Sequence, residues 1–149
     1  MKNFEFHLEK ILAYKDQNLD SELMNLGLLY NSLRQAEEKL SELHAEQDAC
    51  RARYDAAIQE NATVAACSVC LNYTDYLTLQ IKESRKEVDQ IRDQVSEQID
   101  LVKSLKVETK SLETIKESRY EAYKYEASKK AERQIEEYVT SAAAIAKGF

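Results

Sequence analysis

The chain has 149 residues, a formal net charge of −6, 32% charged side chains, no proline and two glycines. Ala, Glu, Lys, Arg and Leu make up close to half of it, a composition typical of coiled coils and long helices. So high a charged fraction argues against the thick core of a compact globule. The negative net charge argues against general nucleic-acid binding. We therefore predict an all-α protein with no nucleic-acid partner.

Three further features of the sequence indicate the cellular environment of the chain. Charges interrupt every apolar run before it reaches the ~18 residues that a membrane-spanning helix needs. The first residues lack the continuous apolar segment of a secretory signal. Three cysteines are an odd number and do not suggest a disulfide framework. We expect a reducing, cytoplasmic environment.

A heptad repeat runs through the first half of the chain. Two rows that alternate three and four residues apart place one apolar stripe on a helix, which is the pattern of a coiled coil. A helix over about 4–60 is expected. The rows are Leu26, Leu33, Leu40, Gln47 and Tyr54, and Leu29, Ala36, Leu43, Cys50 and Ala57.

The second half repeats this pattern and predicts a helix over about 73–146. Beyond Leu112 the apolar spacing drifts to fours, through Tyr123, Ala127, Ala131 and Ile135, which suggests a changed supercoil. The two rows are Ile81, Val88, Val95, Val102 and Thr109, and Leu77, Ser84, Ile91, Gln98, Leu105 and Leu112.

Between the halves, residues 61–72 lose the charged heptads and predict a turn. Asn61 is a candidate to end the first helix, and Asn72 or Thr74 to cap the second. Neither apolar stripe can stay in water, so we expect one domain over 1–149, an elongated antiparallel two-helix coiled-coil hairpin. The longer helix would be unpaired at its C-terminal end. A parallel self-associating dimer is the competing arrangement, which the break at 61–72 disfavours.

No constellation in the sequence points to catalysis. Cys67 and Cys70 have the spacing of a metal or redox pair, but a zinc site needs about four ligands. The remaining candidates, Cys50, His7 and His44, are scattered along the chain. Neither a phosphate-binding glycine loop nor a nucleophile elbow occurs. We predict no enzyme activity, no metal and no cofactor.

Clustered tyrosines and a basic stretch point instead to protein contacts. Tyr73 and Tyr76 crowd the expected start of the second helix, and Tyr120, Tyr123 and Tyr125 crowd a later segment. They cannot all face one partner helix, and exposed tyrosines are good interface anchors. Residues 103–133 hold nine Lys/Arg against six Asp/Glu. That stretch fits either an acidic partner or a solvated helix face.

The stretches Phe4 to Lys15, Asn72 to Leu77 and Leu112 to Tyr123 together resemble the flagellar export protein family FliJ. The start, Phe4 to Lys15, resembles the family's N-terminus, with an aromatic residue followed by spaced apolar residues. The run Asn72 to Leu77 resembles its tyrosine-rich entry to the second helix. The run Leu112 to Tyr123 resembles its most recognisable signature, and the charged stretch Glu126 to Glu137 continues the match. The cysteine-bearing segment 61–72 departs from the family's pattern.

The resemblance implies a soluble, cytoplasmic component of the flagellar type III export apparatus, peripheral to the inner membrane through its partners. Family members are antiparallel coiled coils similar to the central stalk of rotary ATPases. They bind the hexameric export ATPase, which hydrolyses the ATP, and they contact the membrane export-gate protein and export chaperones. A motility system and the equivalent virulence secretion system are both compatible with the sequence.

The resemblance and the hairpin together give two sets of candidate contact residues. A hairpin brings the start of the first helix and the distal part of the second together. The candidates for ATPase binding are Phe4, Phe6, Leu8, Tyr14, Arg119, Tyr123 and Lys130. The candidates for export-gate binding are Leu43, Cys50, Tyr76 and Gln80, among which Gln80 departs from the family's apolar preference.

Three alternatives remain open at this point. One is a generic tether that only sets a distance. Another is a holdase chaperone that grips unfolded clients through Val64, Val69 and Leu71. The third is a metal or redox switch at Cys67 and Cys70.

Overall fold

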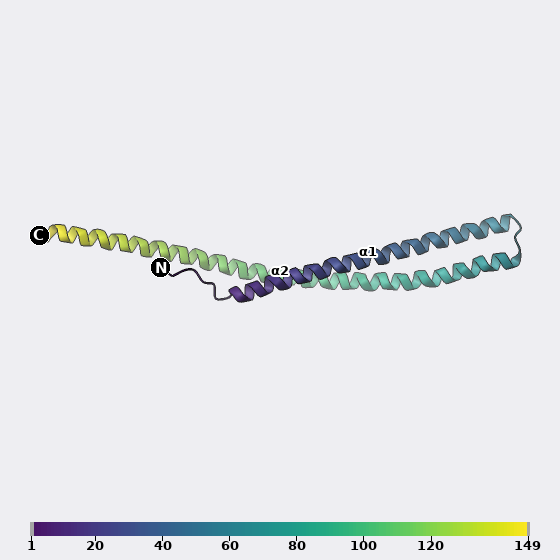
Figure 1. The fold of residues 1–149 in the computed structure, drawn as a ribbon, viewed down its shortest axis with the longest axis horizontal. Coiled ribbons are helices and arrows are strands. Elements are labelled where there is room, and N and C mark those ends of the chain that lie inside the picture. Colours follow the sequence, from purple (N-terminus) through teal and green to yellow (C-terminus); the bar gives the residue numbers. More distant parts are fainter. Residues whose placement is uncertain (1, 149) are drawn as a thin grey trace. The chain divides into compact units, whose positions relative to one another are not determined.

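A computed structural model describes residues 2–148 and contains two long helices (Figure 1). Helix α1 spans Glu9–Gln59 and helix α2 spans Val64–Lys147. The two helices run antiparallel and pack against each other, and the described residues contain no strand. The predicted all-α two-helix hairpin is therefore confirmed.

The seam between the helices is built from the residues that the heptad repeat selects. Every member of the four predicted rows is buried or half-buried. Cys50 is 1% exposed, while Leu77 and Val88 are 2% exposed. Each helix buries only one stripe, because residues that are seven apart lie on the same side of the helix and face its partner.

Polar side chains interrupt this seam, and some of them bridge the helices. Gln47 Nε2 donates a 2.8 Å hydrogen bond to Thr78 Oγ1. Gln98 Nε2 donates to the backbone carbonyl of Glu22 at 2.9 Å. A polar residue at a heptad core position favours the register in which it finds its partner, at some cost in stability. These two bonds therefore help to set which residues of α1 and α2 lie opposite each other.

The turn between the helices occupies only residues 60–63, so the prediction of a turn over 61–72 is wrong for 64–72. Asn61 lies in the left-handed region with φ 53°, as a residue just beyond a helix end often does. Its backbone N–H donates to the Ile58 carbonyl at 3.2 Å, and that of Ala62 donates to the Ala57 carbonyl at 2.9 Å. This pair of bonds is a Schellman motif, which satisfies the last carbonyls of α1.

Thr63, and neither Asn72 nor Thr74, caps the start of α2. Its Oγ1 accepts a 3.2 Å hydrogen bond from the N–H of Ala66, and its carbonyl accepts the first helical bond, from Cys67. Thr74 lies inside the helix and donates to the Cys70 carbonyl at 2.9 Å. Cys67 and Cys70 are half-buried, and the Cys70 carbonyl accepts a 3.4 Å hydrogen bond from Cys50 Sγ of α1, so tertiary contact supports this small-residue segment as helix despite its weak pattern.

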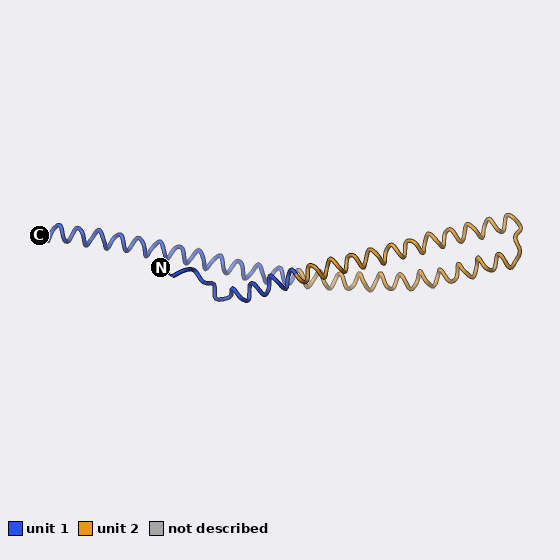
Figure 2. The backbone as a smooth tube through the Cα atoms, in the orientation of Figure 1, with its two compact units in different colours: residues 1–20, 103–149 blue, residues 21–102 orange. Residues whose placement is uncertain are grey.

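The contact pattern divides the chain into two compact units (Figure 2). The terminal unit joins the chain up to Asp20 with the chain from Lys103 onward. The turn unit spans Ser21–Val102. Each unit contains a stretch of both helices, so each has its own piece of the seam.

The N-terminal residues before Glu9 form a non-helical tail, residues 2–8, so the prediction of a helix from residue 4 is wrong there. The N–H of Glu9 donates to the Phe6 carbonyl at 3.0 Å, which closes a turn at the helix start. The negative charge of Glu9 suits the positive end of the helix dipole. The tail also contacts α2, through the Phe4 ring and the Lys2 carbonyl.

The C-terminal part of α2 has no helix beside it in the terminal unit. Tyr123 and Ala127 are half-buried, and every described residue from Ser128 to Gly148 is exposed. The expectation that the longer helix is unpaired at its C-terminal end is confirmed. Of the predicted row with spacing of four, Ala131 and Ile135 thus lie outside the seam.

Candidate functional site

The tail packs an aromatic side chain onto the exposed face of α2. The Phe4 ring lies 5.1 Å from the Tyr120 ring, edge to face, and 5.6 Å from the Tyr123 ring. The Tyr123 hydroxyl donates a 2.7 Å hydrogen bond to the Lys2 carbonyl. Edge-to-face and tilted arrangements are the favourable geometries for aromatic pairs. The three rings therefore join the N-terminal tail to the distal half of α2.

Polar contacts flank these rings. Arg119 Nη1 lies 2.7 Å from His7 Nδ1, and Lys116 Nζ lies 2.7 Å from Glu9 Oε2. Phe6 is buried, with its ring 5.7 Å from the His7 ring. We call the contacts of residues 2–8 with Arg119, Tyr120 and Tyr123 the tail clasp. The tail clasp places residues from both ends of the chain on one surface.

A basic groove begins beside the tail clasp and follows α2. Lys129 Nζ sits 5.7 Å from the centre of the Tyr125 ring, and Lys130 is exposed. Four cations and one carboxylate line the groove, so it would attract an acidic surface. Its lining consists of Lys2, Tyr123, Tyr125, Glu126, Ala127, Lys129, Lys130 and Arg133.

Lys124 is a further cation near the tail clasp, and its charge is locally balanced. The Glu121 carboxylate, 2.9 Å from Lys124 Nζ, raises the pKa of this lysine through a hydrogen bond and through charge attraction. The same nitrogen lies 4.9 Å from the centre of the Tyr120 ring. Lys124 therefore stays charged and helps to hold the Tyr120 ring in place.

Beyond the groove, α2 presents an apolar stripe without a partner among residues 2–148. Ile135, Tyr138, Val139 and Ile145 are all exposed. Their spacing, together with Ala142, is that of one helix face. A contiguous exposed apolar stripe is a common feature of protein interaction sites.

The structure brings together part of the residue set predicted for ATPase binding. Phe4, Arg119 and Tyr123 belong to the tail clasp, and Lys130 lines the adjoining groove. Leu8 is half-buried just before α1 begins, and the tail residue Phe6 is buried.

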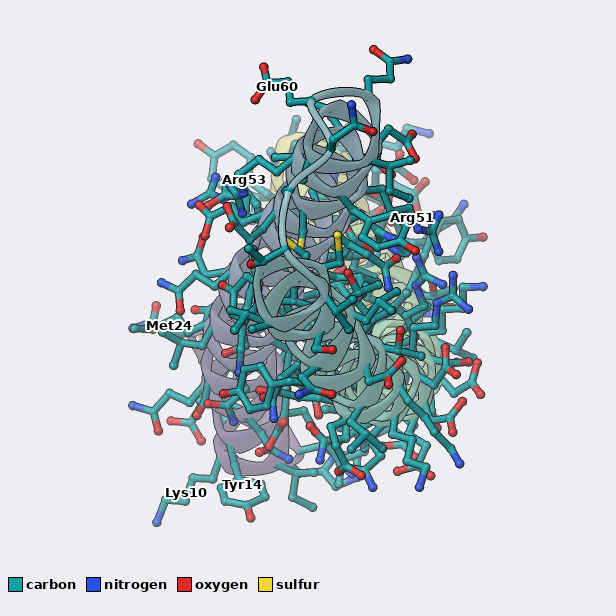
Figure 3. All side chains as sticks on the ribbon, turned by 90° about the vertical axis from the view of Figure 1, so that its right-hand side faces the viewer. Lys10, Tyr14, Met24, Arg51, Arg53 and Glu60 are labelled. Carbon is teal, nitrogen blue, oxygen red and sulfur yellow. The ribbon has the colours of Figure 1, made fainter. Side chains whose placement is uncertain are left out.

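Tyr14 does not join this cluster. It is 65% exposed and, like Lys10, it projects from α1 away from the ribbon (Figure 3). A partner that reaches the tail clasp would need a separate contact to reach Tyr14.

The residue set predicted for export-gate binding divides between the seam and the surface. Leu43 is half-buried in the seam, and Cys50 is buried there with its Sγ 3.2 Å from Thr74 Oγ1. Gln80 is half-buried. Tyr76 is 55% exposed and stacks on Tyr73 with 6.2 Å between ring centres. Cys50 offers no surface to a partner while the seam is closed.

Three contact residues of the tail clasp, Lys2, His7 and Tyr120, were missing from the predicted site. Tyr120 belongs to the tyrosine cluster already noted in the sequence, and continuing the antiparallel register past Lys116 and Glu9 would have placed it opposite the tail. His7 carried no local signal, because its partner Arg119 is 112 residues away. Only the fold of the tail pairs them.

Among residues 2–148, no three His, Cys, Asp or Glu side chains gather closely enough to hold a metal ion. No helix in the described part of the chain is long and apolar enough to cross a membrane.

Comparison with known proteins assigns the chain to a family. The family model described as "Flagellar FliJ protein" matches residues 4–147, nearly the whole sequence. The searches of the curated proteins and of the solved structures gave no match. The match includes both helices, the tail from Phe4 onward and the tail clasp on α2. The chain therefore belongs to the flagellar FliJ protein family, whose members are non-enzymatic components of the flagellar protein export apparatus.

Proposed function

We propose that the chain is a stalk-like component that binds the hexameric export ATPase through its terminal unit. In this proposal it also links the ATPase to the membrane export-gate protein and to export chaperones. The partner hydrolyses ATP, and this chain changes the partner's behaviour only by contact. A single asymmetric helix pair inside a ring must touch the subunits unequally, so it biases their states through differences in contact energy.

The observation that carries the proposal is the crowding of contact-prone groups on the terminal unit. The tail clasp presents half-exposed tyrosines and an arginine, which are the residue types enriched at binding hot spots. The basic groove and the apolar stripe extend from it along α2. Because all 21 residues from Ser128 to Gly148 are exposed in the described part of the chain, a bound protein is the simplest way to cover their apolar side chains.

The export gate is proposed to contact the exposed face of α2 near the turn. Val69, Tyr73 and Tyr76 are exposed and lie on one face of the helix, with Gln80 one turn further on. The seam residues Leu43, which is half-buried, and Cys50, which is buried, would act only by supporting that face. A partner peptide or domain could use the stacked tyrosines as its anchor.

A pull-down with the flagellar export ATPase of the same host, followed by ATPase turnover, tests the main proposal. The double variant Arg119→Ala/Tyr123→Ala should weaken binding at least tenfold, while circular dichroism stays helical. Tyr30→Ala is the matched control, because Tyr30 is an exposed tyrosine of α1 in the turn unit. It should bind like the unchanged protein.

Three results bear directly on the proposal. Absence of binding, together with an unchanged turnover rate and unchanged ring assembly, contradicts it. Equal loss in the control variant would show that the tail clasp is not the contact. Selective binding to the ATPase of a virulence secretion system would keep the stalk role and reassign the system that it serves.

A chaperone role has a separate observation in its favour. Val64, Val69 and Leu71 are exposed near the turn, where a holdase would grip an unfolded client. Suppression of aggregation of a heat-unfolded enzyme, lost in Val64→Ser/Val69→Ser, would support that role. Equal suppression by both proteins would mean that these side chains do not hold clients.

A further inference from the structure

We propose that residues 15–29 of α1 form a weak segment of the seam, which lets the terminal unit and the turn unit open independently of each other. The boundary between the two units falls inside this segment, between Asp20 and Ser21. On α2 the boundary falls between Val102 and Lys103. The weak segment is a property of this chain alone and does not depend on the proposed partners.

The weak segment lies in a stretch of α1 that is only partly buried. Between Leu12 and Ala36, which are each 5% exposed, α1 has no buried residue. Closer to the turn, Gln47 and Cys50 are buried again. Burial of apolar surface is the main force that holds two helices together. Helix α1 is therefore held less firmly in this stretch than near Ala36 or Cys50.

Charged side chains take the place of apolar ones in the weak segment. The seam row of Leu29 continues toward the N-terminus, in steps of seven, with Glu22 and Lys15. Lys15 Nζ lies 2.7 Å from Glu108 Oε2, in an ion pair that solvent reaches. Gln98 Nε2 donates to the Glu22 carbonyl. Solvated ion pairs contribute little to stability, and polar residues at core positions fix the register at a cost in stability.

The backbone of α1 is weakened at the same place. The Glu22 carbonyl that accepts from Gln98 is also the acceptor that an α-helix provides for the N–H of Leu26. A side chain that inserts into this ladder is a known cause of helix bending. Gly27 follows directly, and a Cβ built on it meets no neighbouring atom within 4 Å. Packing within the chain therefore does not require a glycine here, although glycine destabilises a helix interior relative to alanine.

Independent opening would let the two ends of the hairpin respond separately. Proteins open locally in cooperative units, and a segment with few buried contacts is where one unit ends and the next begins. A change of stability in the turn unit would then stop at the weak segment. With a continuous apolar seam, the same change would reach the terminal unit.

Native-state hydrogen exchange of the full chain tests the proposal. Leu77→Ala removes a side chain that is 2% exposed in the seam of the turn unit. It should speed amide exchange in the turn unit about tenfold or more, and leave the exchange of Thr109 and Leu112 in the terminal unit unchanged. In a chain that also carries Glu22→Leu/Gln98→Leu, Leu77→Ala should speed exchange in both units, because an apolar layer then joins the two parts of the seam.

Gln47→Leu is the matched control for the two leucine substitutions. Gln47 is another polar residue of the seam, bonded to Thr78 at 2.8 Å, but it lies inside the turn unit. In this background, Leu77→Ala should still leave the terminal unit unchanged. The proposal is overturned if Leu77→Ala alone speeds exchange in both units, if the units still open separately after Glu22→Leu/Gln98→Leu, or if Gln47→Leu joins them equally well.

A reciprocal measurement keeps the weak segment native, in case the two leucines change how the helices associate. Leu105→Ala removes a side chain that is 6% exposed in the terminal unit. It should speed the amide exchange of Thr109 and leave that of Ala36 and Cys50 unchanged. Faster exchange of Ala36 and Cys50 would show a single cooperative hairpin and overturn the proposal.

Discussion

The Tyr123 hydroxyl of α2 donates a 2.7 Å hydrogen bond to the backbone carbonyl of Lys2, 121 residues earlier in the chain. The ring of the same tyrosine packs against Phe4. The Tyr123 side chain thus holds the tail through its hydroxyl group and through its ring, and a substitution can separate these two contributions.

Tyr123→Phe should loosen the tail while α2 stays intact. The ring contact to Phe4 remains. The loss of one hydrogen bond costs about 0.5–1.5 kcal/mol of stability, and we expect a value near the lower limit because this bond lies close to solvent. The measurement is the intensity of the Phe4–Tyr120 Overhauser contacts at pH 8. Tyr125→Phe serves as the control, because Tyr125 is exposed and, among the described residues, its ring does not pair with those of Phe4, Tyr120 or Tyr123. An equal loss in both variants would contradict the role given to the Tyr123 hydroxyl.

Leu77→Ala should destabilise the turn unit strongly, and Leu79→Ala should not. Leu77 is 2% exposed in the seam and Leu79 is 61% exposed, two residues further along α2. Removing a buried leucine costs about 2–5 kcal/mol, whereas surface substitutions usually stay within about 0.5 kcal/mol. Urea denaturation followed by circular dichroism measures both. Similar midpoints for the two variants would contradict the assignment of the seam.

Thr109→Val should stabilise the terminal unit. Thr109 is buried, and its hydroxyl has no hydrogen-bond partner among the described residues. An unsatisfied buried hydroxyl costs about 1–3 kcal/mol, which a methyl group of the same shape avoids. In the control, Thr114→Val, the exposed hydroxyl that donates to the Lys110 carbonyl is lost with little effect. A lower melting temperature for Thr109→Val would mean that water or a partner satisfies this hydroxyl.

Asn61→Val should destabilise the hairpin at its turn. A left-handed backbone costs an L-residue with a Cβ about 1–2 kcal/mol, and asparagine tolerates it better than a β-branched residue does. Asn61 has φ 53°. Glu60→Val is the matched control, because Glu60 precedes it without a positive φ. Thermal melts that are identical for the two variants would argue against a strained turn residue.

The two helices and the faces that they bury could be predicted from the sequence. The repeat of seven through Leu33, Leu40 and Gln47, and through Val88, Val95 and Val102, follows from local geometry, since a helix places such residues on one side. Burial of all four rows confirms this. The lack of proline and the single interruption of the pattern were enough to predict a hairpin.

The ends of the elements depended on tertiary structure. A segment of small residues such as Cys67 and Cys70 has no strong pattern of its own, and its helix is stabilised by packing against α1. The tail shows the opposite case. The apolar spacing of Phe4 and Leu8 suits a helix, but residues 2–8 are non-helical, and Phe4 packs on Tyr120 from this tail.

The two long helices, and the stripe that each of them buries, follow from the amino-acid sequence alone, because periodicity is a local property. The hairpin predicted that Phe4 comes near Arg119 and Tyr123, whereas the pairing of His7 with Arg119 depends on the non-helical path of residues 2–8. This pairing joins residues more than a hundred positions apart, and no repeat in the sequence encodes it. It also depends on the antiparallel register, which the short turn at 60–63 and the polar bonds across the seam set together.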